Sequence, residues 1–143
     1  MSQGIESVLI FEDYTVKEMV FERNYDFNLE ERSNEVSLEF AFESSAQYSD
    51  NKDKAVLTLS CKVFEEDFSI NDVPFHLRLT VVGYFRCEGD VNIENFQMNG
   101  MAILLPYLRS LITSFTSQAG VPPVIMPPIN VYNAYNHGLK EDF

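Results

Sequence analysis

The sequence LLPYLRSLITSFTSQAGVPPVIMPPINVY, from Leu104 to Tyr132, joins an apolar helical pattern to a hydrophobic segment rich in proline. The apolar residues of its first half recur at the spacing of one buried helix face: Leu104, Leu108, Leu111, Ile112, Phe115 and Ala119. The pattern predicts a long helix over about 99–119 that Asn99 caps. Pro106 removes one backbone hydrogen bond, so we expect either a kink or a late start.

Gly120 stands where a left-handed residue commonly ends a helix. The four prolines that follow exclude both a helix and a central strand: Pro122, Pro123, Pro127 and Pro128. The residues between them are almost all apolar: Val121, Val124, Ile125, Met126 and Ile129. This crossover over 120–131 either packs on the core of its own domain or forms the rim of a hydrophobic groove. A short helix over 132–137 is expected after it.

Upstream, alternating apolar residues predict four strands, at about 8–22, 35–43, 55–64 and 74–87. In the third strand the inward residues are Leu57, Leu59, Cys61 and Val63, and in the fourth Phe75, Leu77, Leu79 and Val81. Residues 44–54 predict a turn-rich connection. In the first strand the apolar residues change from even to odd positions. A bulge near Lys17–Glu18 would bring both sets to the core side: Val8, Ile10, Tyr14 and Val16 before it, and Met19 and Phe21 after it.

Four strands followed by one dominant helix predict a single α+β domain over residues 1–143, with a four-stranded antiparallel sheet. One helix covers such a sheet only partly. Its second face carries smaller residues that suit close approach by another helix: Ile103, Tyr107, Ser110, Ser114 and Ser117. We therefore expect a homo-oligomer, a dimer or a tetramer, in which paired helices lie between sheets.

The composition excludes several classes of partner. The net charge of −12 argues against nucleic acid and anionic membranes, since both require positive surface. Neither a signal peptide nor a membrane span is found in the sequence, so we expect a cytoplasmic protein. Cys61 and Cys87 are expected as free buried thiols, with a disulfide or a metal pair as the alternative.

No catalytic constellation accompanies this composition. The sequence has no nucleophile elbow, zinc-protease motif, phosphate-binding glycine loop or C-x-x-C pair. We interpret His76 and His137 as solvent-facing residues, and the acidic residues as solvated strand faces and loops. We therefore expect no catalytic residues, no metal and no cofactor. A hot-dog thioesterase also wraps a sheet around an apolar helix, but its helix comes early in the chain.

The C-terminal half resembles the SecB family of export chaperones, in which a similar L-F-P-Y-A-R helix runs into a Gly-Pro-Pro segment. The matching residues are Leu105, Pro106, Tyr107, Arg109, Gly120, Pro122, Pro123, Pro128, Asn130 and Tyr135. The resemblance continues more weakly upstream and covers roughly residues 10–136. It implies a dimer of dimers, and an ATP-independent holdase that binds unfolded or precursor polypeptides for protein export.

A holdase needs exposed apolar surface, together with enough charge to keep it soluble. Prolines restrict the free backbone, so a groove wall built on them loses little entropy on binding. Met and aromatic side chains adapt to varied clients. The predicted client-binding residues are Phe75, Tyr84 and Phe85 of the fourth strand and Val124, Ile125 and Met126 of the crossover.

The family passes its clients to the motor SecA, and Glu18 and Glu22 match two acidic positions of that contact. A third such position, acidic in well-known members, is Arg78, and the chain ends in NHGLKEDF instead of a metal-binding tail. Both departures argue against coupling to SecA. The alternatives are a SecB-like chaperone dedicated to a single partner, such as an antitoxin, and a non-catalytic assembly protein.

Overall fold

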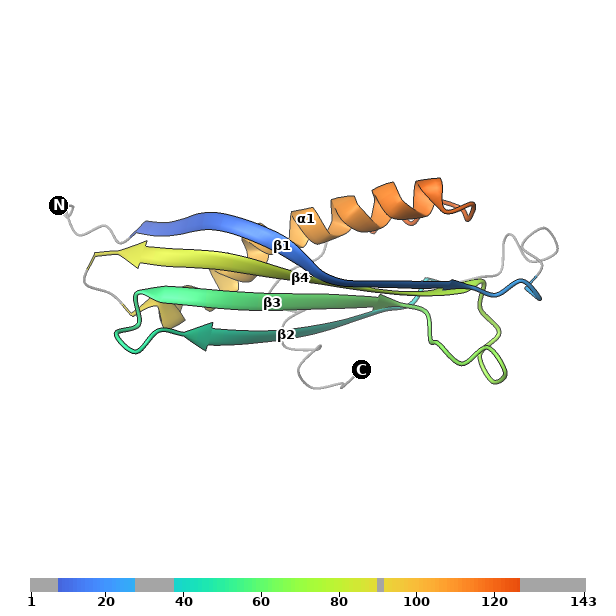
Figure 1. Cartoon of the computed structure of the whole chain (residues 1–143), viewed down its shortest axis with the longest axis horizontal. Coiled ribbons are helices and arrows are strands. Elements are labelled where there is room, and N and C mark those ends of the chain that lie inside the picture. Colours follow the sequence, from blue (N-terminus) through green and yellow to red (C-terminus); the bar gives the residue numbers. More distant parts are fainter. Residues whose placement is uncertain (1–7, 28–37, 90–91, 127–143) are drawn as a thin grey trace.

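The computed structural model describes residues 8–27, 38–89 and 92–126 (Figure 1). Four antiparallel strands form one sheet in the order β1-β4-β3-β2. They are β1 (Val8–Arg23), β2 (Phe40–Tyr48), β3 (Lys54–Val63) and β4 (Phe75–Glu88), followed by the 3-10 helix η2 (Ile93–Phe96) and the helix α1 (Gln97–Gln118). The predicted α+β architecture is confirmed. Residues 127–131 of the crossover and the predicted helix over 132–137 lie outside the described residues.

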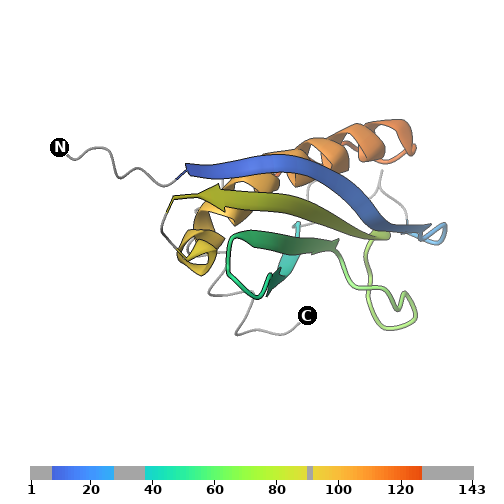
Figure 2. The same cartoon turned by 60° about the vertical axis from the view of Figure 1, so that its left-hand side comes forward.

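The helix α1 crosses one face of the sheet diagonally (Figure 2). At its start, the Tyr48 hydroxyl at the end of β2 donates to Gln97 Oε1 at 3.1 Å. Near its other end, the Phe115 ring lies 5.1 Å from the Phe21 ring of β1. The helix therefore runs from the end of β2 to β1, packs mainly on β4 and β3, and leaves part of β2 uncovered.

The core lies between α1 and the two central strands. The predicted inward residues of β3 and β4 are buried, as are Leu104, Leu108 and Ile112 of α1. The helix packs so closely on β4 that a Cβ on Gly83 would lie 2.6 Å from the Leu104 side chain. The helix also continues through Pro106 from Gln97 onward, so the late start allowed by the sequence does not occur.

The first strand contains two bulges, of which the sequence predicted one. The register with β4 shifts between Val16 and Glu18, as expected, and also between Phe11 and Asp13. Because of this second shift, Leu9 and Phe11 pack on the core. The prediction that Val8 and Ile10 face inward is therefore wrong, and the Val8 side chain is 47% exposed.

The second strand extends further than predicted. Its pairing with β3 runs from Phe40↔Val63 to Tyr48↔Ala55, so Ser44–Tyr48 belongs to the strand and not to a loop. The turn that follows is tight, because the Ser49 hydroxyl accepts hydrogen bonds from the backbone N–H groups of Asp53 and Lys54 at 3.2 and 3.0 Å. The polar residues of β2 misled the prediction, because Glu43, Ser45 and Gln47 lie on the solvent face of the sheet whereas Ser44 lies on the inner face.

His76 is buried, with 1% of its surface exposed, so the expectation of a solvent-facing residue is wrong. The backbone turns at Phe64, which has a positive φ of 62°, and the following loop covers the imidazole. His76 Nδ1–H donates to the Phe64 carbonyl at 2.9 Å, and Nε2 lies 3.7 Å from the Glu66 carboxylate. The residue therefore attaches this loop to the outer face of the sheet.

The start of the crossover is held against α1 by two threonine side chains, which we call the Val124 clamp. Thr116 Oγ1 accepts a hydrogen bond from the Val124 N–H at 2.8 Å, and it donates to the Ile112 carbonyl at 2.8 Å. Thr113 Oγ1 donates to the Val124 carbonyl at 2.7 Å. The clamp satisfies both backbone groups of a buried residue that has no secondary-structure partner.

The reversal of direction before the clamp occurs at Gly120, which has a φ of 83°. Glycine adopts this left-handed conformation without a steric penalty, as expected for the residue that ends a helix. Arg23 Nη1 donates to the Gly120 carbonyl at 2.9 Å, which ties the turn to the end of β1. The chain can therefore run back along α1 in an extended form.

No helix among the described residues has both the length and the apolar character required to cross a membrane.

We predict that Thr116→Val lowers the free energy of unfolding by about 1–3 kcal/mol, because it leaves the buried N–H of Val124 without an acceptor. Valine has nearly the same shape, so packing changes little. Ser117→Ala is the matched control, because the exposed Ser117 hydroxyl donates only within the helix, to the Ser114 carbonyl. Urea unfolding measures both variants. Equal stability of Thr116→Val and the wild type would contradict a clamp.

We also predict that the Cys61 thiol is unreactive in the folded protein. Both cysteines are free and buried, and burial raises the pKa of Cys61 from 9.0 to about 12. The thiolate that reacts with disulfide reagents is therefore scarce at pH 8. In a Cys87→Ala variant, Ellman's reagent should react with Cys61 only after denaturant is added. Rapid reaction of the native variant at pH 8 would show that this part of the core opens easily.

Candidate functional site

The crossover that follows α1 has an inner and an outer side. Val121, Val124 and Met126 are buried in the core. Ile125, between two of them, is 72% exposed, and the neighbouring prolines Pro122 and Pro123 are also exposed. The segment therefore does what both interpretations of the sequence required, since it covers the core of its own domain and presents apolar surface outward.

A groove of about 450 Å³ lies between this segment and the outer side of α1. It combines apolar side chains with hydroxyl groups, and its lining residues are Pro106, Arg109, Ser110, Thr113, Ser114, Ile125 and Met126. The volume is in the range of small-molecule and peptide-side-chain sites. An apolar side chain of a bound polypeptide can contact Ile125 here, while its backbone meets the hydroxyl groups.

Arg109 supplies the one positive charge among the residues that line the groove. Its Nη2 donates to the Met126 carbonyl at 3.4 Å, a long hydrogen bond that links the helix to the crossover. The buried Nε has no hydrogen-bond partner within the described part of the chain.

A second apolar surface lies on the inner side of β2, where α1 does not cover the sheet. Phe40, Phe42, Ala46 and Tyr48 are half-buried against the core, whereas the equivalent residues of β3 are buried. Leu38, just before the strand, is exposed. We call Phe40, Phe42 and Ala46 the β2 strip. The sequence indicated the alternation of Phe40 and Phe42, but neither the place of Ala46 in the strand nor the diagonal path of α1.

The six predicted client-binding residues do not come together on one surface. Phe75 and Phe85 are buried in the core, where their rings pack on other rings, including those of Phe64 and Phe11. Tyr84 is 37% exposed, but it lies on the other face of the sheet, because its neighbour Phe85 faces α1.

On the crossover, the Val124 side chain is buried in the core. Only Ile125 and Met126 of the six residues line the groove. The structure therefore buries Phe75, Phe85 and Val124, which the prediction had placed on the binding surface, and the client-binding role of the crossover stays a prediction.

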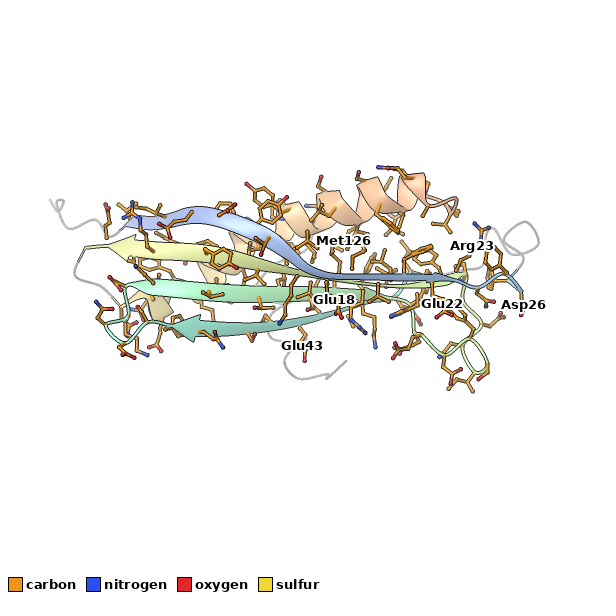
Figure 3. All side chains as sticks on the ribbon, in the orientation of Figure 1. Glu18, Glu22, Arg23, Asp26, Glu43 and Met126 are labelled. Carbon is orange, nitrogen blue, oxygen red and sulfur yellow. The ribbon has the colours of Figure 1, made fainter. Side chains whose placement is uncertain are left out.

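The predicted partner-binding residues, Glu18 and Glu22, are exposed on the outer face of the sheet (Figure 3). Arg78 Nε donates to the Glu18 carboxylate at 3.1 Å, and Arg78 Nη1 lies 4.0 Å from Glu66. The hydrogen bond to Glu18 raises the pKa of Arg78 above its usual value. A cation therefore lies within what would be an acidic surface, and the role of Glu18 and Glu22 stays a prediction.

Within residues 8–27, 38–89 and 92–126, no three His, Cys, Asp or Glu side chains group in a way that could hold a metal ion. The accessible features of the described chain are instead the groove, the β2 strip and the charged outer face of the sheet. These features suit contact with another polypeptide.

The model of the SecB family, preprotein translocase subunit SecB, matches residues 3–142. An uncharacterised protein of Methanocaldococcus jannaschii is 32% identical over 126 residues, which are 86% of this chain and 79% of that protein. The protein-export protein SecB of Nitrosomonas eutropha is 28% identical over 142 residues, 95% of this chain and 86% of the relative. The protein-export protein SecB of Ehrlichia chaffeensis is 28% identical over 109 residues, which are 69% of this chain and 62% of that protein.

The fold is also similar to a solved SecB-like chaperone of Mycobacterium tuberculosis, in complex with a ChAD peptide from the HigA1 antitoxin. The TM-score is 0.68 at 12% identity, over 85% of this chain and 91% of that one. This likeness concerns the fold, whereas the family model covers nearly the whole sequence. The chain belongs to the SecB family of preprotein translocase subunits.

Proposed function

We propose that this protein is an ATP-independent holdase that binds unfolded polypeptides along the crossover groove and the β2 strip, and that it acts in protein export. The observation that carries the proposal is the exposure of Ile125 on a segment whose two neighbouring side chains are buried. Membership of the SecB family supports the same function. The proposal involves no catalytic step, and it places the protein in the cytoplasm.

The clamp gives the proposed groove its physical advantage. A flexible apolar loop would have to become ordered when a client binds, at a cost of about 1–2 kcal/mol for each backbone residue fixed. Here Thr113 and Thr116 already hold the backbone at Val124, and the prolines restrict it further. Contact with Ile125 therefore contributes to binding without that loss.

The net charge of −12 complements the apolar surface. Charge repulsion between separate assemblies opposes their aggregation while they expose Ile125 and the β2 strip. It also favours clients that carry basic residues beside their apolar ones. Binding at several copies of the groove would tighten the hold on one client.

A dedicated chaperone is the second candidate. The solved structure of similar fold contains an antitoxin peptide, and the ion pair between Arg78 and Glu18 neutralises part of the surface expected to contact SecA. Affinity purification from the native cell separates the two candidates. Co-purification of many precursor proteins would support a role in export, whereas co-purification of one stoichiometric partner would support a chaperone dedicated to that partner.

The proposal includes self-association through the exposed side of α1. Tyr107, Ser110 and Ser114 are exposed there, and small side chains let a second helix approach closely. Ser110 and Ser114 also line the groove, so a paired helix would form part of the groove wall. The expected assembly is a dimer or a tetramer in which the helices of different copies face one another.

We predict that the protein suppresses the aggregation of a denatured protein at near-stoichiometric ratio, and that Ile125→Ser weakens client binding about five- to tenfold. The loss corresponds to roughly 1–1.4 kcal/mol of apolar contact, part of the value for a fully buried isoleucine. Ile70→Ser is the matched control, because Ile70 is 78% exposed on the loop between β3 and β4. Light scattering and fluorescence anisotropy provide the two readouts.

If the wild-type protein leaves the light scattering of the denatured protein unchanged, the holdase proposal is wrong. Equal effects of the two serine variants would show that the crossover has no special part in binding.

We further predict that Ser110→Arg shifts the assembly towards smaller species, because a long cation would have to be buried between paired helices. Ser45→Arg is the control, since Ser45 is exposed on β2, away from α1. Sedimentation velocity over a range of concentrations measures both. If Ser110→Arg sediments as the wild type does, the helices do not form the interface.

A further inference from the structure

The loop between β3 and β4, residues 64–74, begins with an unusual backbone conformation. Phe64 has a φ of 62°, and a bulky residue in this left-handed region carries a steric cost, so its surroundings must fix it. The Phe64 N–H donates to the Glu39 carbonyl at 3.2 Å, and the Phe64 carbonyl accepts from His76 Nδ1–H at 2.9 Å. The Phe64 ring also lies 5.1 Å from the Phe75 ring. The loop therefore starts at a strained hinge that its neighbours hold in place.

The buried imidazole of His76 can satisfy both of its nitrogens only when it is protonated. In a neutral imidazole one nitrogen donates and the other accepts. Because Nδ1 donates to Phe64, Nε2 is the acceptor, yet it lies 3.7 Å from another acceptor, the Glu66 carboxylate. Nε2 is buried and has no hydrogen-bond partner among the described residues. A proton on Nε2 turns this contact into a charge-assisted hydrogen bond.

Carboxylates approach the imidazole from two elements. Glu22 of β1 is the register partner of His76 on β4, and both residues lie on the outer face of the sheet. The loop contributes Glu66. Asp67 is engaged within the loop, where its carboxylate accepts from the Ser69 hydroxyl at 2.6 Å. Glu22 and Glu66 are therefore the acidic groups that favour a positive charge on the ring.

Two cations on the same face oppose this charge, and each is held by a glutamate. Arg78 binds Glu18 at 3.1 Å and lies 4.0 Å from Glu66. Lys62, at the end of β3, binds Glu65 at 3.2 Å. The bound carboxylates offset much of the repulsion that these cations exert on a protonated imidazole.

We propose that His76 is a proton-dependent latch for the loop over residues 64–74. The protonated ring holds Phe64 through Nδ1 and Glu66 through Nε2, whereas the neutral ring holds Phe64 alone, and the strain at that residue then favours opening. An open loop uncovers the end of the outer face beside Glu22. The loop is thus held more firmly at pH 5.5 than at pH 8, a range in which histidine usually changes its charge and carboxylates do not. The latch does not depend on the holdase function.

Amide hydrogen exchange tests the latch at two reporter groups. The Phe64 N–H reports on the hinge, and the Asn71 N–H, which donates to the Asp67 carbonyl at 2.8 Å, reports on the loop itself. The rates are compared as protection factors, because unstructured amides also exchange faster at higher pH. Both protection factors should rise about tenfold from pH 8 to pH 5.5.

Glu66→Gln should remove this pH dependence. The amide of glutamine can donate to the neutral Nε2 and accept from the protonated one, so the loop is held at both pH values. The two protection factors should then differ by less than about twofold. Glu65→Gln is the matched control, because Glu65 is an exposed neighbour that binds Lys62, and it should keep the wild-type response.

Nitrogen NMR of the ring provides a second readout. In a His137→Gln background, His76 is the one histidine of the chain. The spectrum should show hydrogen on Nδ1 alone at pH 8 and on both nitrogens at pH 5.5. Hydrogen on Nε2 of the neutral ring would overturn the latch. Protection that does not rise on acidification, or that rises equally in the wild type and Glu66→Gln, would overturn it as well.

Discussion

The arrangement of the apolar surfaces depends on the two hydrogen bonds by which Thr113 and Thr116 hold the backbone of Val124. A segment with several prolines cannot satisfy its own backbone groups in a helix or a central strand. Without the two hydroxyl groups, burying Val121, Val124 and Met126 would leave polar atoms unpaired in the core. The clamp removes that cost at Val124. Because Val124 and Met126 both face the core, Ile125 between them is directed outward.

The same geometry allows one short domain to be stable and still expose apolar surface. Its core is closed by the diagonal packing of α1 on β4, where Gly83 permits close approach. Apart from scattered exposed side chains such as Val8 and Ile70, the accessible apolar surface of the described residues lies mostly in two places, the groove beside Ile125 and the inner side of β2. The excess of acidic residues keeps such a molecule dispersed.

Much of the fold follows from local patterns in the sequence. The alternation in β3 and β4 and the helical spacing in α1 identified the core correctly, because these elements each have one apolar face. The patterns failed where tertiary contacts decide. The second bulge in β1 is set by its pairing with β4, the length of β2 by its pairing with β3, and the burial of His76 by the loop that begins at Phe64.

The site was harder to predict, for a related reason. The sequence indicated the crossover as the important segment, but not which of its residues face outward, since that depends on the position of two threonines one turn of helix apart. It also did not indicate the uncovered strip on β2, which results from the path of α1. The family match identifies the kind of protein, whereas the place on this chain where a polypeptide binds is the proposal that the contacts support.

The most direct test of this account is photo-crosslinking from the outer side of the crossover. A photoreactive amino acid at position 125, with one at the equally exposed position 70 as reference, would be irradiated in the presence of a denatured client. The account predicts strong cross-links to the client from position 125 and few from position 70. Equal yields from the two positions, or cross-links from position 125 only to other copies of this chain, would contradict it.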